Sequence, residues 1–283
     1  MSVETDSLLT GTDLNLQDFQ LLFKEIQDTP FRVVEVDATN RESLKSLLVV
    51  PIRRCYATDE FIQSRAIETN LSQTEVLESK LPDPGATMAG DFGEILAFLF
   101  HQSVELPKVL IGPKKWQLKQ DRKKPAPHSD VLHFHLPSWP NASEYDELLC
   151  SEVKMKSTSS ASSPISSAIS GCENDRTGRL GKTLAWLKER AIGENLVDIS
   201  IGHIERFLKP VEYPACRKRY FAIAIICNAF CDDELDSDPP KIDPSYTFFT
   251  IKITDLHALY NGVFDAVRQS VLNQDAGSVE GTV

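Results

Sequence analysis

A single apolar run, from residue 221 to residue 230, constrains the fold of this chain more than any other feature. Only Asn228 interrupts the run, which is too short to cross a membrane, because a span takes about 18 or more consecutive apolar residues. Continuous apolar character is typical of a central strand that is covered on both faces. The chain has 283 residues, 41% of them hydrophobic, so it can bury a sizeable core around such a strand. We therefore expect a soluble α/β protein without a membrane partner.

Weaker patterns on either side of this run predict the remaining elements. Helices are recognised by apolar residues three or four positions apart, and strands by short stretches rich in β-branched and aromatic residues. On these criteria Asp91 is expected to be the N-cap of its helix. We expect helices at residues 14–28, 91–100, 175–190 and 256–272, and strands at residues 31–36, 130–136, 148–155, 220–230 and 246–253.

Turn-forming residues suggest how the chain is divided. Proline and glycine cluster between residues 81 and 90, where we place a boundary. An N-terminal α/β portion for interaction or scaffolding is expected at residues 1–85, a main domain at 86–273 and a disordered tail at 274–283. Serine occupies eight of the fourteen positions from 157 to 170, so this segment is expected to be a flexible loop.

Charge and cysteine content exclude several classes of protein. The chain has 30 basic and 41 acidic residues, a net charge of −11, which argues against a surface that is basic all over. The first 13 residues contain acids but no lysine or arginine, whereas a secretory signal begins with basic residues. The six cysteines are scattered and include no Cys-x-x-Cys pair. We therefore expect a cytoplasmic protein with reduced thiols.

Positive charge gathers in two segments in the middle of the chain, residues 108–124 and the helix expected at 175–190. Such segments either bind a phosphate backbone or are ordinary solvated surface. Trp116, in the first segment, either stacks on a base or anchors its loop, and we favour the anchor. The candidate DNA-binding residues are Lys114, Lys115, Lys119, Lys123, Lys124, Arg176, Arg179 and Lys182.

Three residues of two neighbouring predicted strands carry the candidate chemistry. Side chains alternate along a strand, so Glu152 and Lys154 are expected on the same face. Asp130 lies 22 residues before Glu152, which leaves room for one antiparallel return that brings the two carboxylates together. Two clustered carboxylates repel each other and call for a divalent metal ion or a raised pKa.

A hard cation such as Mg²⁺, with Mn²⁺ as an alternative, fits one or two carboxylates completed by water. We expect Asp130 and Glu152 to bind the metal, Glu94 to assist from its helix, and Lys154 to stabilise charge during phosphodiester hydrolysis. Acid-x-base triplets occur about four times by chance in such a composition, so the order of the elements has to support the motif. The alternative is an exposed same-face pair, a strand-entry acid and a first-turn glutamate without catalytic roles.

At these positions the chain resembles the PD-(D/E)xK nuclease superfamily over roughly residues 90–230. More narrowly, three segments resemble the HamA family, the nuclease subunit of the bacterial Hachiman anti-phage system. The resemblance implies a DNA-degrading effector that is held inactive by a partner helicase of the HamB type and released from it. One departure is Ser129, where the superfamily has proline, and the serine-rich segment is another. The three segments are Gly90-Asp91-Phe92-Gly93-Glu94, the stretch from Lys119 through His128-Ser129-Asp130-Val131-Leu132, and Ser151-Glu152-Val153-Lys154-Met155.

A non-catalytic subunit that docks on a helicase is the competing function. In that case the carboxylates need not meet, and the basic segments need not surround them. A structure with Glu152 and Lys154 on opposite faces, or with Asp130 far from Glu152, would exclude the catalytic interpretation.

Overall fold

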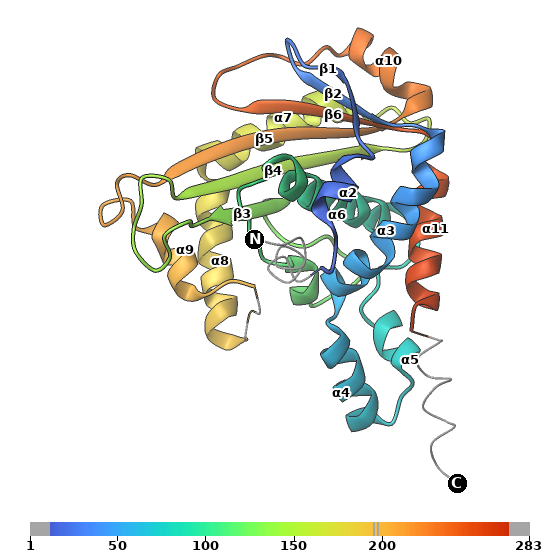
Figure 1. Ribbon diagram of the computed structural model, residues 1–283, viewed down its shortest axis with the longest axis vertical. Helices are drawn as coiled ribbons and strands as arrows, with labels where there is room; N and C mark the ends of the chain where they lie inside the picture. Colours follow the sequence, from blue (N-terminus) through green and yellow to red (C-terminus); the bar gives the residue numbers. More distant parts are fainter. Residues whose placement is uncertain (1–11, 195, 197, 272–283) are drawn as a thin grey trace.

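The computed structural model describes residues 12–194, 196 and 198–271, and its centre is a six-stranded mixed sheet (Figure 1). In spatial order the strands are β1 (Lys24–Gln27), β2 (Arg32–Val36), β6 (Thr247–Ile253), β5 (Arg217–Cys227), β4 (Glu147–Lys156) and β3 (Val131–His135). The two outer pairs, β1 with β2 and β3 with β4, are antiparallel, and the other neighbours are parallel. The expected α/β class with a mixed central sheet is confirmed.

Helices cover both faces of this sheet, and two more extend away from it (Figure 1). The extended pair is α4 (Asp59–Thr69) and α5 (Gln73–Glu78). The face that we call the α6 face packs against α2 (Leu16–Gln20), α3 (Ala38–Tyr56), α6 (Ala86–Val104) and α11 (Leu256–Gln269). The opposite face, the α7 face, packs against α7 (Pro164–Asn174), α8 (Leu180–Gly193), α9 (Ile201–Leu208) and α10 (Asn228–Ser237).

Strand β5 confirms the expectation of a central strand that is covered on both sides. Ile223 and Ile225 belong to the hydrophobic core on the α6 face, and Ala222 and Ala224 to the core on the α7 face. All four side chains are fully buried. The strand ends at Cys227, and the last three residues of the expected strand form the start of α10 instead.

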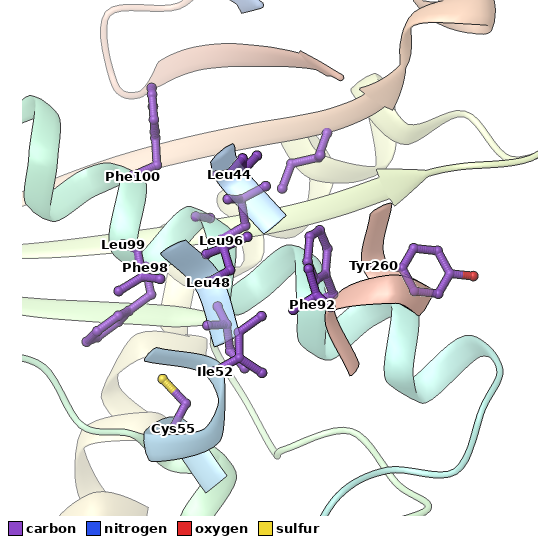
Figure 2. Packing of buried hydrophobic residues seen from close by; sticks show 14 of the residues in the cluster. Leu44, Leu48, Ile52, Cys55, Phe92, Leu96, Phe98, Leu99, Phe100 and Tyr260 are labelled. Atoms are coloured by element: carbon purple, nitrogen blue, oxygen red, sulfur yellow. The ribbon is translucent and has the colours of Figure 1, made fainter. Parts of the chain in front are cut away.

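Helix α6 lies in the larger core, where Figure 2 shows Phe92 and Leu96 among buried side chains of α3 and α11. Its backbone comes close to the sheet, since a Cβ atom at Gly93 would lie 3.4 Å from Met155 Cβ. The helix begins at Ala86, so the prediction that Asp91 is its N-cap was wrong. Asp91 is instead 1% exposed, and it accepts hydrogen bonds from Tyr56 Oη at 2.7 Å and from Lys119 Nζ at 2.6 Å.

Two other local predictions were wrong because strand pairing and core packing decide the structure at these places. The helix expected at 14–28 ends at Gln20, and Lys24–Gln27 forms β1 by pairing with β2. The serine-rich segment is not a loop throughout, because α7 begins at Pro164. The apolar residues of α7 share a hydrophobic core with β5, and the helix lies over β4 and β5. The helix expected at 175–190 is a π-helical turn (Asp175–Arg179) followed by α8.

The N-terminal portion adds strands to the same sheet. Strand β2 pairs in parallel with β6, with Val34 opposite Ile251, and the core on the α6 face contains residues from both sides of the expected boundary at residue 85. The tail expected at 274–283 lies outside the described residues. None of the helices in the described part of the chain is long and apolar enough to cross a membrane.

Candidate active site

Strands β3 and β4 bring three of the predicted residues together. Val131 lies opposite Ser151 in the antiparallel register, so Asp130, just before β3, lies beside Glu152. Asp130 Oδ2 accepts a hydrogen bond from the backbone N–H of Val153 at 2.9 Å and lies 3.5 Å from Lys154 Nζ. Lys154 Nζ also donates to Glu152 Oε1. The ammonium group of Lys154 therefore bridges the two carboxylates on the α7 face.

Glu152 is covered by α7 and by the π-helical turn. Arg179 donates to Glu152 Oε2 and, at 2.7 Å, to the backbone carbonyl of Gly171. A Cβ atom at Gly171 would lie only 2.3 Å from Glu152 Oε1, so this close approach requires glycine. A cavity of about 500 Å³, bounded by serines of α7, opens beside Glu152 and Lys154.

Glu94 approaches the same strand ends from helix α6. Its Oε2 atom accepts a hydrogen bond from Trp116 Nε1 at 3.2 Å and lies 3.3 Å from Lys115 Nζ. Lys115 Nζ also donates to the carbonyl of Ser129 at 2.7 Å, so it links Glu94 to the residue that precedes Asp130. Trp116 is 2% exposed and anchors its loop, as favoured from the sequence.

Burial and the mutual repulsion of the carboxylates disfavour the ionised forms of Glu94 and Glu152. Burial raises the pKa of Glu94 to about 8, and Asp130 and Asp91 add to this rise against the opposing charge of Lys115. Burial likewise raises the pKa of Glu152 to about 7, with Asp130 adding and Lys154 opposing. Burial alone lowers the pKa of Lys154, but Asp130 and Glu152 outweigh it and raise this pKa above its usual value. The site is therefore one in which an added cation is favourable.

The donor atoms suit a hard divalent cation. Carboxylate oxygens are the ligands that Mg²⁺ and Mn²⁺ prefer, and Mg²⁺ needs only one or two of them besides water. Among the described residues, no hydrogen bond occupies Asp130 Oδ1, whereas Lys154 and Arg179 occupy both oxygens of Glu152. In the described ranges no three acidic, histidine or cysteine side chains already converge as a metal cluster. Metal binding would therefore require one of the two cations to release Glu152.

The predicted DNA-binding residues fall into two groups. The side chains of Lys114, Lys115 and Lys119 are only 4–6% exposed, and Lys114 pairs with Asp198 at 2.7 Å, Lys115 with Glu94 and Lys119 with Asp91. Their charges are neutralised inside the protein, so we do not carry these three into the proposed DNA-binding surface. The exposed or partly exposed group consists of Lys123, Lys124, Arg176, Arg179 and Lys182.

Sequence reasoning missed Asp175, a buried residue that joins the two strands of the site. Its Oδ1 atom accepts hydrogen bonds from Ser129 Oγ at 2.6 Å and from Arg179 Nε at 2.6 Å. The backbone N–H of Ser129 donates to Thr183 Oγ1 at 3.2 Å, which fixes the entry to β3. The spacing of Asp175 and Arg179 is that of a helical ion pair, but nothing in the sequence indicates that Asp175 is 2% exposed.

Comparison with known proteins agrees with the resemblance that these residues suggest. A search of curated proteins gave no match. A protein-family profile described as HamA matches residues 14–267 of the 283, a range that includes all four candidate catalytic residues. The match covers well over half of the chain, and the chain belongs to the HamA family.

Proposed function

We propose that this chain is a metal-dependent deoxyribonuclease that hydrolyses DNA phosphodiesters, with Mg²⁺ as its cofactor and Mn²⁺ as an alternative. The meeting of Asp130, Glu152 and Lys154 beside an open cavity carries the proposal. An ordinary surface ion pair does not explain why Glu152 is 3% exposed and yet borders that cavity. Buried carboxylates of raised pKa that line a cavity are typical of functional sites.

Each residue has a separate task in this proposal. A bound metal ion supplies a Lewis acid and a water of lowered pKa. Asp130 and Glu152 would hold the ion, and Glu94, at the other side of the β3 entry, would assist. Lys154 would stabilise the negative charge that develops on the phosphate, because its ammonium group already lies between the two carboxylates. Lys123, Lys124 and Lys182 would contact the DNA backbone.

Membership of the HamA family supports a role in Hachiman anti-phage defence. We extend the proposal to a cytoplasmic effector that a HamB-type helicase holds inactive and then releases. The pairing of Glu152 with both Arg179 and Lys154 is consistent with a resting state, since neither oxygen of this carboxylate is free for a metal ion.

The same pairing favours a second candidate function, a non-catalytic subunit that docks on the helicase. A carboxylate that is neutralised by two internal cations needs no metal for the fold to be stable. Under this alternative, the carboxylates maintain the packing of α7 on β4 and have no chemical task.

Cleavage of plasmid and linear DNA by the purified chain, with Mg²⁺ and with EDTA, separates the two functions. The test variant is Glu152→Ala combined with Lys154→Ala. Glu147→Ala is the matched control, because Glu147 also lies on β4 in ion pairs, but at the other end of the strand. Metal-dependent cleavage that is lost only in the double variant supports the nuclease.

The assay is repeated with the helicase partner and its nucleotide, so that an inhibited enzyme is not mistaken for an inactive one. Absence of cleavage in the released state, or equal cleavage by the double variant, contradicts the nuclease and favours the docking subunit.

A further inference from the structure

One face of helix α8 carries a stripe of cations around a tryptophan. Arg179, Lys182, Trp186 and Arg190 are three or four residues apart, so they lie on the same side of the helix. The stripe begins at Arg179, the residue bonded to Glu152. At a rise of about 1.5 Å per residue, Trp186 lies about 10 Å along the helix from Arg179.

Trp186 is half-buried and borders a cavity of about 260 Å³. The indole and two prolines, Pro125 and Pro127, supply flat apolar walls, and Lys124 and Arg190 lie at the cavity as cations. The Arg190 guanidinium lies 5.8 Å from the centroid of the indole ring, which is within cation–π range. The apolar walls of this cavity suit the flat face of a nucleobase, and its two cations suit the adjoining phosphates.

The positive charge at this cavity is only partly compensated. Asp121 also lines the cavity, 3.5 Å from Lys124, and Glu194 pairs with Arg190 at 3.0 Å. The Lys124 side chain nevertheless remains 78% exposed, and both pairs are of the weak surface kind.

The stretch between this cavity and the candidate active site is also positive. The His128 ring lies 5.9 Å from that of Trp186, two residues before Asp130. Lys115, Lys182 and Arg179 are the charged side chains that act on this ring. Cations therefore surround His128 between this cavity and Glu152, to which Arg179 donates a hydrogen bond.

We propose that the cavity beside Trp186 binds one unstacked base of a single-stranded DNA segment, with Lys124 and Arg190 on the flanking phosphates. The inference rests on the proposed function and deepens it by naming the form of the substrate. Every base has a π-face, so stacking on Trp186 requires no particular sequence. The base would be held about three nucleotides from Arg179, at about 3.4 Å per nucleotide of a stacked strand.

Binding of a fluorescein-labelled 20-residue oligothymidylate, measured by anisotropy in EDTA, tests this proposal without any cleavage. Removal of a stacking partner costs about 1–3 kcal/mol per base, so Trp186→Ala should weaken binding by about 5- to 150-fold. Trp186→Phe keeps an aromatic face and should retain most of the affinity.

Trp139→Ala is the matched control. Trp139 is 41% exposed and also lies beside a histidine and an arginine, but in the loop at the opposite end of β3 from Asp130. This variant should bind the oligothymidylate as the wild type does.

A second probe of equal charge keeps the test decisive if Trp186→Ala folds poorly. An abasic 20-residue strand has the phosphates without the bases, so the wild-type protein should bind it several-fold more weakly than the oligothymidylate. Equal binding of the two strands by the wild type, or equal affinities of the Trp186→Ala and wild-type proteins, overturns the inference.

The two proposals fail in different ways. Base-dependent binding without cleavage in any state would contradict the nuclease and leave the base-binding cavity standing. Cleavage that needs Glu152, together with binding that is independent of Trp186, would contradict only the cavity.

Discussion

The raised pKa of Glu94 makes the stability of the metal-free protein depend on pH in a way that one substitution removes. Glu94→Gln keeps the shape of the side chain and an acceptor for Trp116 Nε1, while Lys115 keeps its 2.7 Å hydrogen bond to Ser129. Between the usual glutamate pKa and about 8, the folded protein retains a proton that the unfolded chain has released. Stability should therefore fall as the pH rises through this window.

The size of the effect follows from linkage. With a pKa of 4.5 in the unfolded chain and about 8 in the folded protein, the raised pKa of Glu94 lowers the free energy of unfolding by about 1 kcal/mol at pH 5 and by about 4 kcal/mol at pH 8. The wild type should thus lose about 3 kcal/mol relative to Glu94→Gln over this range, an upper figure because part of the shift comes from the negative charges of Asp130 and Asp91.

Urea denaturation in EDTA, followed by tryptophan fluorescence at several pH values from 5 to 8, measures this difference. Any constant offset between the two proteins reports the exchange of a protonated carboxyl group for an amide, whereas the difference in slope with pH reports the titration of Glu94. Stability curves that stay parallel from pH 5 to pH 8 would refute the reasoning, because they would mean that Glu94 is already ionised in the folded protein at pH 5.

Three further predictions concern the surroundings of the site. Gly171→Ala would place a methyl group 2.3 Å from Glu152 Oε1 and should lower the DNA cleavage rate at least about 10-fold. Gly181→Ala, with nothing within 4 Å, should cleave as the wild type does, and equal rates for both variants would contradict the packing of α7 on Glu152. Burial lowers the pKa of His101 to about 4, so stability is complete above pH 6.5 and is lost as the pH falls towards 4. Between pH 7 and 4.5 the wild type should therefore lose about 2 kcal/mol more free energy of unfolding than His101→Gln, as measured by thermal unfolding. Identical pH profiles of the two proteins would contradict a neutral buried imidazole. Lys119→Ala leaves the Asp91 carboxylate buried and unpaired, and it should cost about 3–5 kcal/mol in urea denaturation. Lys123→Ala, at a side chain that is 68% exposed, should cost less than about 0.5 kcal/mol, and similar losses for both would refute the division of the lysines into buried and exposed.

Those parts of the fold that depend on local pattern could be predicted from the sequence. The alternation in β4 correctly placed Glu152 and Lys154 on one face, and the 22-residue return correctly brought Asp130 beside them. The apolar run correctly indicated the central strand β5, because a strand that is buried on both sides needs no polar residues along most of its length.

Elements that depend on tertiary partners could not be predicted. Lys24–Gln27 is a strand because β2 lies beside it. Segment α7 is a helix in a serine-rich stretch because three small or apolar side chains share a core with β5, and the helix lies over β4 and β5. Short segments of this kind take the structure that their tertiary contacts favour, whatever their intrinsic propensity.

The ion pairs of the lysine-rich segment, residues 108–124, could not be predicted from the sequence either. A cluster of positive charge in the sequence does not reveal that Lys114 pairs with a residue 84 positions later or that Lys119 pairs with one 28 positions earlier. Asp175 was overlooked for the same reason, since its role depends on the distant Ser129. Trp186 could be recognised as part of a stripe only after the helix that carries it was placed beside Glu152.

The central claim is that Asp130 and Glu152 hold a metal ion that hydrolyses DNA. Its most direct test is the single-turnover rate of cleavage of an end-labelled duplex, with Mg²⁺ and the activated helicase partner, by the wild type and by Asp130→Asn. Metal stabilisation of a transition state is worth several kcal/mol, so the account predicts a loss of at least about 100-fold in the variant. Asp265→Asn, at an exposed carboxylate on α11, is the control and should cleave as the wild type does. Equal rates for the wild type and Asp130→Asn would contradict the claim.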